Sequence, residues 1–236
     1  MWRELTHRGY LAIDSSYSGP DVPLRFRYHT YEFGQRDIHL RSLRDTQQFQ
    51  DPTGSAEELG ISPANWSLFG VVWDSSQVLA NLMADYNVNG LRILELGCGL
   101  ALSSLLLNLR GADITATDYH PEAEGYLEIN TVLNDGDAIP FVRTGWEDAD
   151  SGLGKFDLII GSDVLYESEH YTQLANFVEA HSNPSSTTII VDPGRKQHAR
   201  FSKVMVSKGF THSQHPVEDT TYLAKPHGGV VITYTR

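Results

Sequence analysis

The stretch from Ile93 to Ala101, with the sequence Ile-Leu-Glu-Leu-Gly-Cys-Gly-Leu-Ala, constrains the fold of this chain more than any other. It predicts a buried strand, a tight turn and the start of a helix. Gly97 and Gly99 let the backbone turn sharply and approach a ligand where a side chain would collide. Asp118 ends the next predicted strand, about 20 residues on, where a carboxylate is placed to accept hydrogen bonds from ribose hydroxyls. The pattern predicts an α/β protein that binds an adenosine-containing ligand.

The residues around the turn narrow the choice of ligand. A dinucleotide-binding loop requires Gly-x-Gly-x-x-Gly, and Leu102 stands at the third glycine position. A phosphate-binding loop requires a lysine after the glycines, and none is present there. What remains, Glu95-x-Gly97-x-Gly99, resembles the first motif of class I S-adenosylmethionine-dependent methyltransferases. The resemblance implies that the turn faces the methionine part of the cofactor and that Asp118 holds its ribose. A strand–turn–helix unit without a ligand is the alternative.

Length and composition fit one soluble α/β domain with an N-terminal extension, because 236 residues suffice to bury a core and 40% of them are hydrophobic. No run approaches the ~20 apolar residues that span a membrane, and the N-terminus carries no apolar signal segment. We therefore expect a cytoplasmic protein without a membrane partner. Cys98 is the only cysteine, which excludes an internal disulfide and suits a reducing compartment. Between two glycines, it is expected to pack in the cofactor loop rather than to act as a nucleophile.

Charge and spacing exclude other ligands. Broad contact with nucleic acid needs a basic face, so a net charge of −12 predicts no nucleic acid partner and favours a cationic substrate. Two pairs, Glu167 with His170 and His212 with His215, resemble metal ligands. A di-metal bundle needs two Glu-x-x-His pairs on facing helices, and residues three apart on a strand point to opposite faces. We therefore expect no metal.

Strand and helix signals alternate from Gly90 onward, which predicts a parallel sheet with helices on both faces. The predicted strands are Arg92–Leu96, Asp113–Thr117, Pro140–Thr144, Phe156–Gly161 and Thr187–Val191, and the predicted helices are Leu100–Leu109, Pro121–Leu133, Tyr171–His181 and Lys196–Lys208. Thr211–Val217 and Val230–Thr235 lack an intervening helix and predict an antiparallel pair. This ending resembles the seven-stranded methyltransferase sheet, whose last strand inserts antiparallel. We assign residues 69–236 to this domain.

Residues 1–68 form a different kind of sequence, which we predict to be a β-rich extension followed by a loop. Leu24–Phe33 alternates bulky apolar and polar residues, and Ile38, Leu40 and Leu43 continue the pattern after a glycine, so a β-hairpin is expected. Gln47–Ala64 is rich in Asp, Pro, Gly and Ser and predicts a loop.

A helix is predicted after Trp73, with Asp74 or Ser75 as its N-cap. Its apolar face, which we expect to pack on the sheet, consists of Val78, Leu79, Leu82, Met83 and Tyr86.

Polar clusters follow three of the predicted strands, at the edge where open parallel sheets bind ligands. After the third strand, Trp146 could cover an adenine, and Glu147 or Asp148 could bind its exocyclic amine; a loop tryptophan packed on the sheet edge is the alternative. After the fourth strand, Asp163 and Tyr166 suit an amine that awaits methylation, the alternative being a capping aspartate and a packed tyrosine. After the fifth strand, Asp192-Pro-Gly-Arg195 is either a structural turn or a substrate contact.

Together these residues resemble a family. Trp73, Glu95-Leu-Gly-Cys-Gly-Leu, Asp118, Asn130, Trp146 and Asp163-Val-Leu-Tyr166 are similar to methyltransferase family 16, seven-stranded enzymes many of which methylate lysines on non-histone proteins. The resemblance spans roughly Phe69 to Gly194. It implies that Asp163 and Tyr166 line the methyl-transfer pocket. It implies cofactor contacts from Trp73, Glu95, Gly97, Cys98, Gly99, Asp118, Trp146 and Ser162.

The chain departs from related patterns at two places. Asp74-Ser75-Ser76 follows Trp73, where the family often carries a proline. Val164 and Leu165 stand where enzymes that methylate adenine or glutamine amides usually have prolines, so the chain resembles those enzymes less.

The expected reaction is direct transfer of a methyl group from a sulfonium to a neutral lysine amine. Deprotonating a lysine of pKa about 10.4 costs roughly 4–5 kcal/mol near neutral pH, which a desolvating pocket lowers. We therefore assign Asp163 to positioning the amine rather than to taking its proton. A small-molecule methyltransferase is the first alternative. A closed, ligand-sized pocket beneath Leu24–Leu43 would favour it, whereas an open groove leading to Asp163 would favour a protein substrate. A non-catalytic module that keeps the cofactor is the second.

Overall fold

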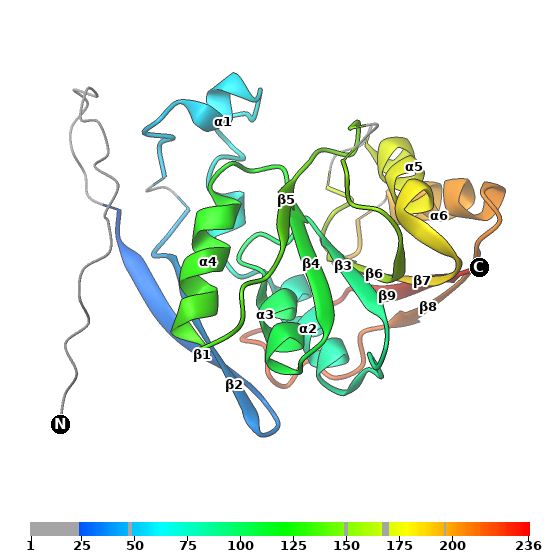
Figure 1. Ribbon diagram of the computed structural model, residues 1–236, viewed down its shortest axis with the longest axis horizontal. Helices are drawn as coiled ribbons and strands as arrows, with labels where there is room; N and C mark the ends of the chain where they lie inside the picture. The colour runs from blue at the N-terminus through cyan, green and yellow to red at the C-terminus, as the bar shows by residue number, and fades with distance from the viewer. Residues whose placement is uncertain (1–23, 47–48, 149–150, 167–169, 196) are drawn as a thin grey trace.

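The computed structural model describes residues 24–46, 49–148, 151–166, 170–195 and 197–236. Its centre is a seven-stranded sheet in the order β5-β4-β3-β6-β7-β9-β8, shown in Figure 1. The strands are β3 (Arg92–Leu96), β4 (Asp113–Asp118), β5 (Phe141–Arg143), β6 (Phe156–Ser162), β7 (Ser182–Asp192), β8 (Thr211–Pro216) and β9 (Val230–Thr235). Strands β3 to β7 pair in parallel, and β9 inserts antiparallel between β7 and β8. The predicted sheet, including its antiparallel last strand, is confirmed.

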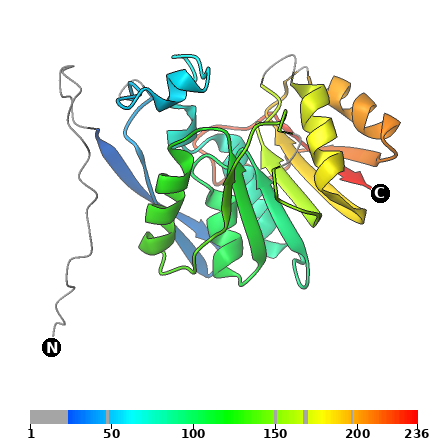
Figure 2. The same ribbon diagram turned by 45° about the horizontal axis from the view of Figure 1, so that its top comes forward.

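Helices cover both faces of this sheet, as Figure 2 shows. They are α2 (Asp74–Asp85), α3 (Leu102–Leu109), α4 (Ala123–Leu133), α5 (Tyr171–His181) and α6 (His198–Ser207). Successive strand residues point to opposite faces: Ile93 belongs to the core under α2, α3 and α4, whereas Leu94 belongs to the core under α5 and α6. Both faces of β3 are therefore buried, which explains its continuous apolar sequence. Among the described residues, no helix is long and apolar enough to cross a bilayer.

The N-terminal region supplies a separate antiparallel hairpin of β1 (Phe26–Phe33) and β2 (Arg36–Leu43), as predicted. Its buried residues Ile38, Leu40 and Leu43 join the core that contains α2 and α3. The hairpin therefore packs on the helical layer of the domain and shares its core. The boundary that we placed at residue 68 stays a prediction.

Asn130 of α4 and Asn134, the C-cap residue of that helix, bind the hairpin to the domain. The Oδ1 of the fully buried Asn130 accepts the backbone N–H of Arg41 at 2.8 Å, and its Nδ2 donates to the carbonyl of the same residue at 3.3 Å. One turn later, Asn134 makes the same pair of bonds to the N–H and carbonyl of His39, both at 2.7 Å, at an exposed position. These side chains satisfy the outer edge of β2 in the way that a further strand would.

We expect Asn130→Ala to lower the free energy of unfolding by about 2–3 kcal/mol, because it leaves the N–H and carbonyl of Arg41 without partners in a buried setting. Urea denaturation measures the change. Asn134→Ala removes equivalent bonds where water can replace them, and it should cost less than about 1 kcal/mol. Equal losses in the two variants would contradict the assignment of Asn130 as the main anchor.

The structure corrects several predicted boundaries and contacts. Helix α2 has Trp73 at its N-cap, without a side-chain capping bond, and Asp74 is its first helical residue rather than its cap. Leu82 is 38% exposed and so lies off the buried face that Val78, Leu79 and Met83 form. The backbone of Trp73 is extended, and helix α2 begins at the next residue.

Two further segments differ from the predictions. The predicted loop Gln47–Ala64 contains the short helix α1 (Ser55–Glu58), whose backbone N–H groups at Ala56 and Glu57 donate to the carboxylate of Asp51. Strand β7 begins at Ser182, five residues before the predicted Thr187. The first residues of β7 are polar, so a search for apolar runs does not predict them as strand. Backbone pairing with β6 nevertheless extends to Ser182.

Candidate functional site

The glycine turn lies between β3 and α3, and three residues in it have left-handed backbone conformations. The φ angles are 54° at Gly97, 53° at Gly99 and 58° at Ala101. A Cβ on Gly97 would lie 3.2 Å from Val164 Cγ1, and a Cβ on Gly99 would lie 3.1 Å from the carbonyl oxygen of Phe69. Both conformation and space therefore require glycine at these two positions.

Asp118, at the end of β4, is bound to the glycine turn. The N–H of Gly99 donates to its Oδ2 at 2.8 Å, and the N–H of His120 donates to its Oδ1 at 2.8 Å. Burial raises the pKa of the Asp118 carboxyl, although these backbone bonds act in the opposite direction. Each oxygen retains acceptor capacity after one bond. The residue is therefore suited to accept ribose hydroxyls beside the turn.

Glu95, predicted as a cofactor contact, is only 2% exposed and binds the start of α3. Its Oε2 accepts the backbone N–H of Ser104 at 2.9 Å and a short bond from the Ser104 hydroxyl. Burial raises the pKa of Glu95 to about 7, and the nearby Asp118 carboxylate adds to the increase. The contacts observed for Glu95 tie β3 to the helix behind the turn, and its contact with a cofactor stays a prediction.

Glu95 predicts a pH-dependent stability. The pKa in the folded state, about 7, lies above the ordinary value of 4.5, so the folded protein retains the proton while the unfolded chain loses it. The free energy of unfolding should therefore fall by about 3 kcal/mol as the pH rises from 4.5 to above 7. Glu95→Gln should remove this dependence, because an amide does not titrate in this pH range. Its single amide oxygen can still accept both bonds that Oε2 accepts now.

Urea denaturation of the wild type and of Glu95→Gln at pH 5 and pH 8 tests this expectation. The variant should gain stability relative to the wild type as the pH rises, and Glu124→Gln, at an exposed position of α4, should not. A difference between Glu95→Gln and the wild type that stays constant with pH would show that the Glu95 carboxyl titrates normally.

Cys98 is buried between the two glycines, and its burial raises the pKa of the thiol well above the ordinary value. A neutral thiol is a poor nucleophile. Its backbone N–H donates to the carbonyl of Thr117 at 2.9 Å, which links the turn to β4. The structure therefore agrees with a packing role for Cys98.

The segment after β5 places Trp146 behind the glycine turn. Its ring packs edge-on against Phe177 with centroids 5.4 Å apart, and its Cζ2 lies 4.0 Å from the position of a Cβ on Gly97. Asp148 Oδ2 accepts the Thr144 hydroxyl at 2.9 Å and the N–H of Gly145 at 2.8 Å. Asp148 thus organises its own turn.

Glu147 is the second carboxylate, besides Asp148, that was predicted to bind the adenine amine. Its Oε1 accepts a hydrogen bond from Gln173 Nε2 at 2.6 Å, at an exposed position. The role of Glu147 and Asp148 as adenine contacts stays a prediction.

Asp163 follows β6 with a left-handed φ of 53°, an uncommon conformation for a residue with a side chain. Arg195 forms a two-point ion pair with it: Nε donates to Oδ1, and Nη2 donates to Oδ2 at 2.8 Å. The Asp163 carboxylate raises the pKa of Arg195. The buried Asp192 places this arginine, because its Oδ1 accepts the N–H groups of Gly194 at 2.8 Å and Arg195 at 2.6 Å. The sequence pattern placed Asp163 and Arg195 at the same edge of the sheet but did not predict the ion pair between them.

A pocket of about 230 Å³, which we call the Asp163 pocket, opens at this edge. It is lined by Val72, Trp73, Asp74, Ser75, Asp163, Pro193 and His227. Trp73 is 42% exposed at its mouth, and its indole N–H donates to the carbonyl of Leu68 at 3.0 Å. The structure brings Trp73 and Asp163 together in this pocket. Tyr166 is 50% exposed and lies close enough to Arg195 to add to the increase that Asp163 causes in the pKa of that guanidinium, and its place in the methyl-transfer pocket stays a prediction. Ser162 ends β6 immediately before Asp163.

Sequence analysis missed an aromatic cluster beside Asp118. The ring of Phe69, in a short 3-10 helix (Leu68–Gly70), stacks on His120 with centroids 4.0 Å apart, and Phe49 and Tyr126 meet it edge-on. Burial lowers the pKa of His120 to about 4, so its ring is neutral at neutral pH. These residues come from three separate parts of the chain, around Phe49, around Phe69 and from His120 to Tyr126, and no spacing in the sequence connects them.

Within the part of the chain that the structure describes, no group of three or more His, Cys, Asp or Glu side chains could hold a metal ion. His212 lies on β8 and stacks on Tyr234 with centroids 6.0 Å apart. Glu167, the first predicted helix residue Lys196 and the N-terminal residues 1–23 lie outside the described residues.

Comparison with known proteins identifies the family. A family model described as lysine methyltransferase matches residues 59–207, which is more than half of the chain. The chain belongs to this lysine methyltransferase family. The match covers the glycine turn, Asp118, Asp163 and Arg195, the residues that the structure gathers at one edge of the sheet.

Two named methyltransferases align with part of this chain. Protein N-lysine methyltransferase METTL21A of Danio rerio is 31% identical over 138 residues, which cover 54% of this chain and 62% of that protein. A histidine protein methyltransferase 1 homolog of Dictyostelium discoideum is 30% identical over 117 residues, covering 47% of this chain and 38% of that protein. The aligned part of the chain thus spans less than two thirds of the length of each relative.

Solved structures confirm the methyltransferase fold. Magnesium protoporphyrin IX methyltransferase from Synechocystis, solved with bound SAM, has a TM-score of 0.55 and 20% identity, covering 69% of this chain and 80% of that chain. A 16S rRNA methyltransferase from T. thermophilus, solved with AdoMet and guanosine, has a TM-score of 0.61 and 16% identity, covering 92% of this chain and 52% of that chain. At these identities the likeness concerns the fold.

Proposed function

We propose that this chain transfers a methyl group from S-adenosylmethionine to the Nζ of a lysine in a protein substrate. One observation carries the proposal: in a lysine methyltransferase fold, the Asp163 pocket opens at the carboxyl edge of the sheet. Open parallel sheets bind their ligands at this edge.

The residues of the glycine turn and of β4 fit the cofactor. A Cβ at Gly97 or Gly99 would make tight contacts of 3.2 and 3.1 Å at a positive φ, and Asp118 keeps acceptor capacity beside the turn. The backbone of the turn would hold the methionine part, Asp118 the ribose, and Trp73, Trp146 and Ser162 would flank the ligand. When bound, the cofactor supplies a sulfonium-activated methyl group. The protein therefore has to bind, orient and desolvate the acceptor, and it needs no nucleophile of its own.

Asp163 is suited to orient a neutral amine. A carboxylate offers about four acceptor positions, and Arg195 uses two of them, so two remain for the N–H groups of a lysine. The guanidinium also neutralises the negative charge of Asp163, which reduces its preference for an ammonium ion. The apolar wall of Val72, Trp73 and Pro193 lowers the pKa of an entering lysine by desolvation. Proton loss to water then precedes transfer.

The size of the Asp163 pocket favours a side chain over a whole small molecule. Its volume of about 230 Å³ lies below the roughly 300–1,000 Å³ that is usual for small-molecule sites. The relatives named above act on proteins according to their names, which supports a protein acceptor for this chain too. The small-molecule alternative is therefore the weaker one.

Incubation of the pure protein with methyl-labelled S-adenosylmethionine and a native protein extract tests the proposal. We expect time-dependent labelling of a few proteins, and its loss when S-adenosylhomocysteine is added in excess. Boiled enzyme controls for background. Label that enters only small molecules or nucleic acid, or no label above background, would contradict it.

A further inference from the structure

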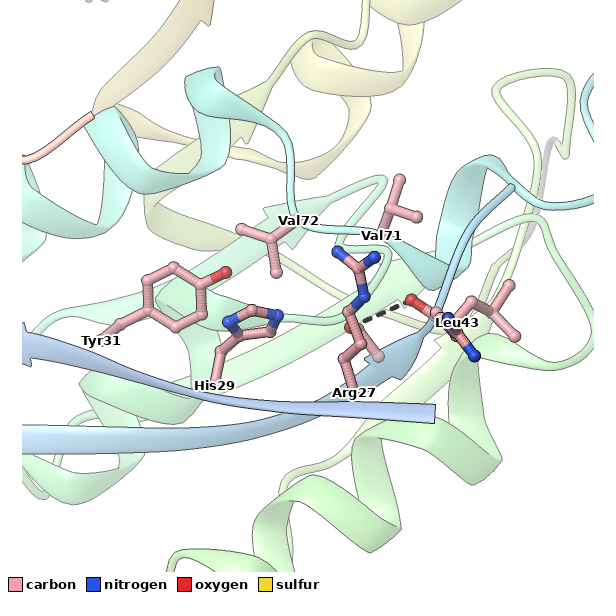
Figure 3. Close-up of a pocket in the computed structure, with 8 residues that line it drawn as sticks. Arg27, His29, Tyr31, Leu43, Val71 and Val72 are labelled. Carbon is pink, nitrogen blue, oxygen red and sulfur yellow. Dashed lines mark hydrogen bonds between the residues drawn. The ribbon is translucent and has the colours of Figure 1, made fainter. Parts of the chain in front are cut away.

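The hairpin forms a second pocket next to the Asp163 pocket. This hairpin pocket has a volume of about 160 Å³ and lies between the hairpin and the segment that leads into α2, as Figure 3 shows. It is lined by Arg27, His29, Tyr31, Ser42, Leu43, Arg44, Val71 and Val72. Arg27, His29 and Tyr31 alternate along β1, so their side chains point to the same side, toward Val71 and Val72.

The hairpin pocket is basic in a chain whose net charge is −12. Arg27 and Arg44 are exposed at its rim, and no carboxylate of the described residues forms an ion pair with either guanidinium. His29 lies on the same side of β1 as Arg27. Guanidinium groups bind carboxylates through two parallel hydrogen bonds, which makes them selective for this anion geometry.

The two pockets have opposite charge and a common wall. Val72 lines both of them. Beyond it, the Asp163 pocket presents the carboxylate of Asp74 and that of Asp163, which is paired with Arg195, whereas the hairpin pocket presents Arg27 and Arg44. A bound segment that carries a lysine and a nearby acidic residue would match both signs.

We propose that the hairpin pocket binds the side-chain carboxylate of an aspartate or glutamate that lies near the target lysine of the protein substrate. The proposal rests on the proposed function, because it requires the lysine to enter the Asp163 pocket. The two pockets share the lining residue Val72, and an extended chain advances about 3.3 Å per residue. The acidic residue is therefore expected within a few residues of the lysine, and a spacing of three is the one to test first.

Direct binding tests the proposal without relying on turnover. The full chain, labelled with ¹⁵N, is titrated with a peptide of alanines that carries one lysine and one glutamate three residues away, in each of the two orders. The Nε–H signals of Arg27 and Arg44 should shift on titration with one order of the peptide. The same signals should shift at least fivefold less with the glutamine counterpart or with acetate. Arg36, at the far end of the hairpin, serves as the internal reference.

Three outcomes of this titration would overturn the proposal. These are no shift at Arg27 and Arg44, equal shifts with the glutamine peptide, and equal shifts with acetate, which would identify a general anion site. None of them depends on methyl transfer, so failure of this inference is distinguishable from failure of the proposed function.

Labelling in extract gives a second readout. Methylated lysines should carry an acidic residue at one preferred offset, and Arg27→Gln with Arg44→Gln should raise KM for such substrates about tenfold while leaving kcat unchanged. Arg36→Gln is the matched control and should leave KM unchanged. In Arg44→Glu, the preference should move from acidic toward basic neighbours. Methylated sites without charge preference, in wild type and variants alike, would overturn the proposal.

Discussion

Replacing Gly97 with arginine is expected to reduce the affinity for S-adenosylmethionine at least 100-fold in a calorimetric titration. The backbone at this position has a φ of 54°, which a residue with a Cβ rarely adopts, and the added Cβ would lie 3.2 Å from Val164. The rest of the arginine side chain would extend toward the ligand or displace the turn from Asp118. Either result removes the surface that the cofactor contacts.

Gly111→Arg is the matched control for this variant. Gly111 also has a positive φ, 71°, but a Cβ there would meet nothing within 4 Å. The Gly111→Arg substitution strains the backbone about as much as Gly97→Arg does. The affinity of the Gly111→Arg variant for S-adenosylmethionine should equal that of the wild type. Thermal unfolding shows whether each variant is folded. A folded Gly97→Arg protein with unchanged affinity would show that the glycine turn does not bind the cofactor.

Asp163→Asn should lower kcat about 100-fold and change the affinity for S-adenosylmethionine less than twofold. Asparagine tolerates the left-handed conformation of this residue, so the backbone should be preserved. The amide loses the ion pair with Arg195 and two of the acceptor positions that would hold the lysine amine. Loss of orientation at a reacting group is commonly worth about this factor. Single-turnover methylation measures the effect.

Arg195→Gln separates the two roles of Asp163. It removes the same ion pair but leaves the carboxylate, so we expect a smaller decrease in kcat, about tenfold. If the two variants lost equal activity, Asp163 would act only through its arginine. If Asp163→Asn retained full turnover, its assignment to amine positioning would be wrong.

The sequence alone predicted the parts of the structure that rest on local rules. The strand, glycine turn and helix around Gly97 follow from one short segment, and the apolar runs of β3, β6 and β7 follow from burial on both faces. The antiparallel pairing of β8 and β9 was visible because no helix separates them. The alternation over Leu24–Phe33 likewise predicted the hairpin.

The contacts between distant segments could not be predicted in this way. Arg195 and Asp163 follow different strands, and only the adjacency of β6 and β7 with the turn at Asp192 brings them together. Phe69 and His120 stack although neither belongs to a recognisable pattern. The carboxylate of Glu95 binds Ser104, a contact that the glycine motif by itself does not indicate. Such pairings depend on side-chain packing that a periodic pattern does not encode.

The hairpin differs in sequence pattern from the rest of the chain and is nevertheless attached to it. Asn130 of α4, the C-cap residue Asn134 and the shared core hold β2 against the helical layer. This attachment places the hairpin pocket beside the Asp163 pocket. Under our proposal, one substrate segment contacts both.

The identity of the methylated residue tests the central claim most directly. A protein labelled in native extract by the pure enzyme is digested, and the modified residue is located by mass spectrometry with a heavy-methyl donor. The account predicts heavy methyl groups on the Nζ of a lysine, incorporated about 100-fold more slowly when Asp163→Asn replaces the wild type. Heavy methyl on histidine or on another side chain, produced by an enzyme that binds the cofactor, would contradict it.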